Sequence, residues 1–160
     1  MTELEKAYIA GFLEADGCIM LQLVYRHDYI LGYQIRASIV FYQKSKYKPF
    51  LNWLKSKLAY GYIRDRNDGM SEYTIVGYRA VEKVINDLKP YLRIKRQQAE
   101  IVLDVIQQTP RKKRRFYTPA MLLKLAKEVD KFIDLNYSKK RKNTSKEVYY
   151  YLLSHKLISP

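Results

Sequence analysis

The chain has 160 residues, of which 48% are hydrophobic and 29% charged, a balance typical of one globular domain with a buried core. Lys and Arg number 30 against 16 acidic residues, so the formal net charge is +14 and a polyanion such as nucleic acid is the expected partner. A single cysteine excludes an internal disulfide, and two distant histidines disfavour a structural zinc site.

We expect no membrane partner, because no apolar run reaches transmembrane length. The first residues lack the basic-then-apolar pattern of a signal peptide. The protein is therefore expected to act in the compartment where it is made, such as a chloroplast or a prokaryotic cytoplasm.

The first predicted element is a helix over residues 3–15. Thr2 and Glu5 form the capping-box pattern that starts a helix, and apolar residues recur after them at helical spacing. We expect Gly17 to end the helix, because glycine readily takes the left-handed cap conformation. Small residues on this helix would let another helix approach closely. That contact is expected at Ala7, Ala10, Gly11 and Glu14.

The remaining elements follow from the spacing of apolar residues, which is two in a strand and about 3.6 in a helix. They are strands over 18–26 and 33–43, a helix over 46–59, strands over 61–66 and 70–76 joined by an Asn-Asp-Gly turn, and helices over 79–88, 95–108, 118–135 and 145–156. Ser145 is expected to cap the last helix.

This order predicts an α+β fold. Its α-β-β-α-β-β-α core would contain a curved, antiparallel four-stranded sheet, and further helices would follow at the C-terminal end. We assign residues 1–108 to the core, and residues 109–160 to a basic linker and C-terminal helices of the same domain.

The predicted sheet has one apolar face, which helices must cover, and one polar face. Arg can bind guanine through two hydrogen bonds, Gln can bind adenine in the same way, and Glu can accept from cytosine. A polar face that combines them indicates a surface that reads bases in duplex DNA. A solvated sheet face without any ligand is the alternative. The predicted DNA-binding residues of this face are Gln22, Arg26, Gln34, Arg36, Ser38, Arg64, Arg66, Glu72 and Thr74.

Two basic runs, at 111–115 and 139–142, would neutralise phosphates and add salt-sensitive affinity without sequence preference. A solvated loop or a localisation signal has the same composition. The predicted phosphate-binding residues of these runs are Lys112, Lys113, Lys139, Lys140 and Arg141.

Residues 9–17, Ile-Ala-Gly-Phe-Leu-Glu-Ala-Asp-Gly, combine small residues, bulky apolar residues and two carboxylates. A carboxylate held at the end of a packed helix suits a hard metal ion, although a merely buried helix would show the same small residues. The run resembles the motif of the LAGLIDADG homing endonucleases. Residues 61–66, 91–99 and 129–136 resemble further segments of the small, single-motif branch found in algal organelle introns.

This resemblance implies an intron-encoded endonuclease that cuts both strands of a long, nearly palindromic duplex DNA site by metal-dependent phosphodiester hydrolysis. It implies a homodimer, because one chain carries one motif, and the helix contact at Ala7, Ala10, Gly11 and Glu14 would then join the two copies. Mg²⁺ is the expected cofactor, and Mn²⁺ or another divalent ion could replace it.

By position in the motif segments, Asp16 matches the metal-binding carboxylate and Ala15 the residue that lends a backbone carbonyl. Gln43 matches a glutamine near the attacking water, and Lys95 a lysine near the scissile phosphate. Departures from the family pattern fall at Glu14, Cys18, Tyr47 and Lys48.

Two other functions would use the same basic surface. A maturase-like protein would bind intron RNA without needing Asp16. A general nucleic-acid-binding protein, such as a ribosomal one, would bind every duplex with a similar salt dependence. Asp16, Gln43 and Lys95 together favour the nuclease.

Overall fold

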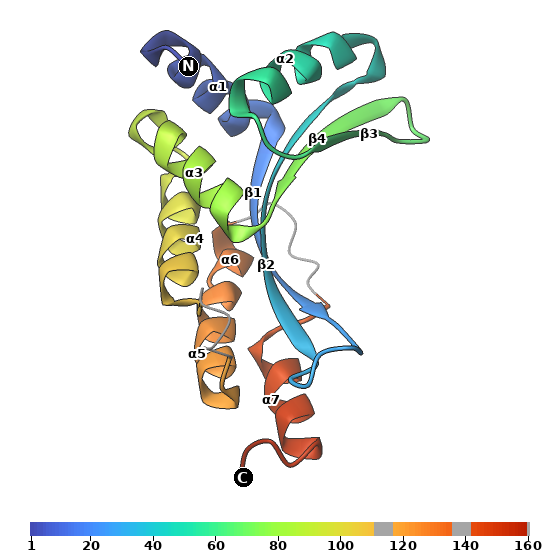
Figure 1. Ribbon diagram of the computed structural model, residues 1–160, viewed down its shortest axis with the longest axis vertical. Helices are drawn as coiled ribbons and strands as arrows, with labels where there is room; N and C mark the ends of the chain where they lie inside the picture. The colour runs from blue at the N-terminus through green and yellow to red at the C-terminus, as the bar shows by residue number, and fades with distance from the viewer. Residues whose placement is uncertain (111–116, 136–141, 160) are drawn as a thin grey trace. The chain divides into compact units, whose positions relative to one another are not determined.

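The computed structural model describes residues 1–110, 117–135 and 142–159 (Figure 1). The elements in chain order are α1 (Glu3–Asp16), β1 (Gly17–Tyr25), β2 (Tyr33–Lys44), η1 (Ser45–Tyr47), α2 (Lys48–Leu58), β3 (Tyr62–Asp65), β4 (Met70–Val76), α3 (Tyr78–Leu88), η2 (Lys89–Tyr91), α4 (Arg96–Gln108), α5 (Pro119–Asp130), α6 (Phe132–Leu135) and α7 (Ser145–Ser154). Every predicted helix and strand has a counterpart, which confirms the α+β class.

The chain forms two compact units. The first contains Met1–Met20 and Ala37–Glu100, and the second contains Leu21–Arg36 and Ile101–Pro160. In the described ranges, no helix is both long enough and apolar enough to cross a membrane.

The four strands form one sheet in the order β1-β2-β4-β3. In the first unit, β2 pairs antiparallel with β4, and β4 pairs antiparallel with β3. Residues directly opposite each other on two antiparallel strands point to the same face. Phe41 opposite Tyr73 therefore belongs to the apolar face, and Arg64 opposite Glu72 belongs to the polar face.

A series of ring contacts joins the helices of the first unit to the apolar face of the sheet. Phe12 of α1 stacks on Phe41 of β2 with ring centroids 6.0 Å apart, and Phe41 stacks on Tyr73 of β4 at 5.8 Å. Phe12 also meets Phe50 of α2 edge to face at 4.7 Å. These contacts fix the C-terminal half of α1 over the sheet.

Tyrosines organise the second unit. Tyr25 and Tyr33, on the two strands of the first hairpin, each make an edge-on contact with Tyr151 of α7. Gly32 has a positive φ of 68°, and a Cβ there would lie 2.3 Å from the Tyr151 ring. Glycine is therefore required at this turn both by its backbone conformation and by the close approach of the ring.

The C-terminal helices differ from the prediction at two points. Thr144, not Ser145, caps α7, and Glu147 completes the capping box, while the Ser145 N–H donates to Asp130. The helix predicted over 118–135 is two helices, because the Lys131 N–H bonds to the Glu128 carbonyl three residues back and α5 ends at Asp130.

The end of α1 also differs from the prediction. Gly17 is not left-handed: its φ of −119° and ψ of 172° are extended, and it begins β1 directly. Glycine is needed there for space, since a Cβ would lie 2.6 Å from Leu13 Cδ1 and 2.9 Å from the Leu13 carbonyl oxygen. The chain thus passes from helix to strand without a loop, immediately after Asp16.

Candidate active site

Asp16 ends α1, and its carboxylate is exposed. Across the described residues it makes no hydrogen bond or ion pair, and no group of three or more His, Cys, Asp or Glu side chains forms a closed metal site. Mg²⁺ commonly binds one or two carboxylates and fills its other positions with water and phosphate oxygens. The Asp16 carboxylate and the carbonyl of neighbouring Ala15, in the last turn of the helix, fit such an open site.

Lys95 lies beside this turn, although it is far from Asp16 in the sequence. Its side chain is buried (9% exposed), and Nζ donates to the carbonyl oxygens of Leu13 at 2.8 Å, Glu14 at 2.7 Å and Gly17 at 2.8 Å. An ammonium group has three N–H donors, so all three are used. Burial lowers the pKa of Lys95, whereas the nearby groups of Cys18, Glu14 and Asp16 act to raise it.

The Glu14 side chain, on α1, bonds in turn to the backbone of the segment that carries Lys95. Its Oε1 accepts from the backbone N–H groups of Arg93 at 2.6 Å, Ile94 at 2.7 Å and Lys95 at 3.1 Å. This carboxylate is therefore held by its own chain, and the assignment of Glu14 to a surface between two copies stays a prediction.

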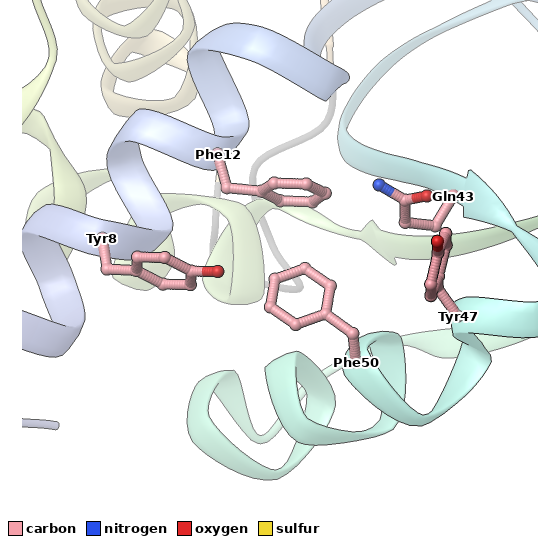
Figure 2. A pocket seen from close by; sticks show the side chains of 5 residues that line it. All are labelled: Tyr8, Phe12, Gln43, Tyr47 and Phe50. Carbon is pink, nitrogen blue, oxygen red and sulfur yellow. The ribbon is translucent and has the colours of Figure 1, made fainter.

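Gln43 lies near the end of β2, in a hollow of about 270 Å³. Figure 2 shows that Tyr8 and Phe12 come from α1, Phe50 from α2 and Tyr47 from η1. Gln43 Oε1 accepts from the Lys44 N–H at 3.0 Å. The fold thus brings Lys95 to the Asp16 turn, but within the described chain no hydrogen bond joins Gln43 to either residue.

The aromatic lining of this hollow is what the sequence reasoning missed. Tyr8 and Phe12 are four residues apart on α1, a spacing that puts both side chains on one helix face and could have indicated them. Tyr47 is exposed at the hollow, with Lys46 Nζ 4.8 Å from the centre of its ring. Lys48 is engaged elsewhere, in a 2.6 Å ion pair with Asp65.

The predicted contact surface of α1 is only partly exposed. Ala7 and Gly11 are exposed, and a Cβ at Gly11 would meet no atom of the described residues within 4 Å. Ala10 is wholly buried in its own chain, next to buried Ile9, so its assignment to this surface is wrong. Leu4, 84% exposed, shares the open face of the helix instead.

The polar face of the β3–β4 hairpin holds its arginines with acidic neighbours. Arg64 pairs with Glu72 and Arg66 with Asp68, both at 2.8 Å. At the β1–β2 turn of the second unit, Arg26 binds both carboxylate oxygens of Asp28, at 2.9 and 2.8 Å. The three arginine side chains are 42–66% exposed, and these contacts restrict the orientation of their guanidinium groups.

Two predicted members of this face are covered. Ser38 is 3% exposed and Thr74 is 5% exposed, so the expectation that both are open to a ligand is wrong. Thr74 lies between Val40 and Tyr62, its partners on the two neighbouring strands, and these larger side chains enclose it.

The other predicted binding residues have mixed positions. Gln22 is exposed, whereas Gln34 and Arg36 are half-buried, and Arg36 Nε is buried without a hydrogen-bond partner among the described residues. The predicted phosphate-binding residues Lys112, Lys113, Lys139, Lys140 and Arg141 lie outside the described residues.

The fold and site together define an α+β protein whose motif helix delivers an exposed carboxylate to the start of a four-stranded sheet. The family model of the LAGLIDADG endonucleases matches residues 9–103, and the chain belongs to this family.

Two curated relatives are similar over most of their length. The chain is 40% identical to DNA endonuclease I-CvuI of Chlorella vulgaris, over 87% of this chain and 84% of that protein. It is 33% identical to DNA endonuclease I-CreI of Chlamydomonas reinhardtii, over 88% and 84%. A crystal structure of I-CvuI with its DNA target in the presence of calcium matches with a TM-score of 0.91, at 37% identity and over 98% of both chains.

Proposed function

We propose that this protein is a homing endonuclease that cuts both strands of a long, nearly palindromic duplex DNA site. The observation that carries the proposal is the exposed Asp16 carboxylate at the end of the family's motif helix, which makes no hydrogen bond or ion pair with the described residues. The relatives named as DNA endonucleases favour this activity over an RNA-binding maturase. The arginines of the β3–β4 hairpin, exposed and held by acidic neighbours, suit the reading of base edges.

Asp16 and the Ala15 carbonyl would hold a divalent metal ion, Mg²⁺ or, in its place, Mn²⁺. Such an ion, when bound, makes its water more acidic and neutralises charge on the phosphate. Gln43 would orient the attacking water, because its Oε1 is fixed by the Lys44 N–H and its amide nitrogen faces the hollow (Figure 2).

The active protein would be a homodimer bound to double-stranded DNA. Each chain offers one Asp16, whereas a duplex has two strands to cut. The exposed strip of α1, with Leu4, Ala7 and Gly11, would contact the same helix of a second copy, and the small residues Ala7 and Gly11 would allow a close approach. A two-fold axis at this strip would supply one carboxylate for each strand.

Replacement of Asp16 tests the activity. A cleavage selection on a randomised duplex library first identifies the target. Asp16→Asn is then expected to bind that duplex with near-normal affinity in Mg²⁺ but not to cut it, because the amide keeps the shape and loses the charge that holds the metal. Gel shifts and cleavage assays measure both effects. Cleavage by this variant at the normal rate would remove Asp16 from the mechanism.

A further inference from the structure

Glu14 and Lys95 join the end of α1 to the segment just before α4, because each side chain bonds to the backbone of the other residue's segment. The Lys95 ammonium holds three carbonyls at the end of α1, and the Glu14 carboxylate holds three backbone N–H groups just before α4. We call this pair of residues the reciprocal clamp. All of its bonds lie within the first compact unit, between 2.6 and 3.1 Å.

The Lys95 side chain is fully committed in this arrangement. Its three donors are occupied, and its position suits a cation because the carbonyl end of a helix carries partial negative charge. α1 has no basic residue in its own last turn, so Lys95 supplies the missing charge. Turning the ammonium toward a phosphate would leave three carbonyls without this donor.

The backbone carbonyls that Lys95 binds lie on both sides of the candidate metal ligands along the chain. Lys95 binds the carbonyls of Leu13, Glu14 and Gly17 but not those of the two residues between Glu14 and Gly17. Those two residues are Ala15 and Asp16, which provide the proposed metal ligands. The clamp thus fixes the backbone on both sides of these ligands and leaves them free.

We propose that Lys95 and Glu14 are positioning residues: together they fix the turn that carries the Ala15 carbonyl and the Asp16 carboxylate, and Lys95 acts without touching the scissile phosphate. This inference rests on the proposed function, because it takes Asp16 as the metal-holding group. It assigns Lys95 a role different from the phosphate contact that the family resemblance implies.

Two replacements of Lys95 separate positioning from phosphate contact. Lys95→Met keeps the length of the side chain and removes the ammonium. Lys95→Arg keeps the charge, but the planar guanidinium cannot direct its donors at three converging carbonyls. A positioning role predicts that both variants fail alike, whereas a phosphate contact predicts that the arginine retains much of the activity.

The decisive measurement is metal binding without cleavage. Ca²⁺ is titrated calorimetrically into the protein bound to its selected duplex. Lys83→Met is the control, since among the described residues Lys83 forms its ion pair with Asp87 on the surface of α3. We expect both Lys95 variants to bind Ca²⁺ at least tenfold more weakly, with duplex affinity changed less than threefold and the control unchanged. Normal Ca²⁺ affinity in Lys95→Met, together with cleavage restored by Lys95→Arg, would overturn the positioning role.

Glu14 provides a second test if the Lys95 variants do not fold. Glu14→Ala removes the acceptor of three N–H groups, whereas Glu14→Gln keeps one side-chain oxygen for them. We expect Glu14→Ala to weaken Ca²⁺ binding at least tenfold and Glu14→Gln to weaken it less. Equal, normal Ca²⁺ affinity in both would contradict the clamp. Absence of Ca²⁺ binding by the unchanged protein would instead overturn the metal role of Asp16 itself.

Discussion

At the scale of single residues, acidic neighbours restrict the arginines that were expected to read bases. Arg26 is the clearest case, because its guanidinium binds Asp28 through two hydrogen bonds and lies 5.0 Å from the centre of the Tyr29 ring. A side chain already fixed in one orientation loses less conformational entropy on binding a base. If Arg26 reads a base as proposed, Asp28 would therefore contribute to recognition by orienting Arg26, without contacting DNA itself.

The pairing of Arg26 and Asp28 predicts an unusual titration. The hydrogen bonds from Arg26 lower the pKa of Asp28 from 3.8 to about 2. Because the folded-state pKa is the lower one, the pair is fully formed above pH 3.8 and is lost as the pH falls through about 2. Carbon-13 NMR of the Asp28 carboxyl should show a titration midpoint at about pH 2 in the folded protein. Arg26→Ala should return it toward 3.8; a midpoint near 3.8 with Arg26 present would show that the pair does not form in solution.

At the scale of elements, the direct passage from α1 into β1 fixes the position of the Asp16 carboxylate, the proposed metal ligand. Gly17→Ala should disturb this passage, because the new methyl group would lie within 3 Å of Leu13 Cδ1 and of the Leu13 carbonyl oxygen. We expect a loss of about 1–3 kcal/mol in the free energy of unfolding, measured by denaturant titration.

Gly11 supplies the matched control on the same helix. Within the described part of the chain, a Cβ at Gly11 meets nothing within 4 Å. Gly11→Ala should therefore not lower the stability of the single chain and should raise it by about 0.5–1 kcal/mol through better helix propensity. Equal destabilisation by both substitutions would mean that the contact with Leu13 does not limit position 17.

Local sequence signals predicted the elements well and long-range contacts poorly. The capping box at Thr2 and the alternation in the strands are local, and both appear as expected. The clamp between Glu14 and Lys95 joins residues 81 positions apart, so no local pattern could indicate it. The burial of Ala10 and Thr74 likewise depends on what tertiary packing places over them.

At the scale of the whole molecule, the site of one chain is half of what the proposed reaction needs. We expect Gly11→Leu to shift the protein toward monomer and to lose double-strand cutting, because a bulky side chain at a two-fold axis clashes in both copies, at a cost of about 1–3 kcal/mol for each overpacked contact. Sedimentation velocity and plasmid cleavage measure the two effects.

In a single-chain fusion of two copies, Asp16→Asn in one copy should give a nick in one strand only. A compact monomer that cuts both strands would contradict the paired arrangement.

The reciprocal clamp also bears on how such a protein can change in evolution. Its two halves lie on opposite sides of both hairpins in the sequence, so an exchange of the N-terminal motif alone between relatives transfers Glu14 without its partner. If the clamp positions the metal-binding turn as proposed, recombination within the intervening segment would separate residues that function together, and we expect the motif helix and the segment just before α4 to be exchanged successfully only as a pair.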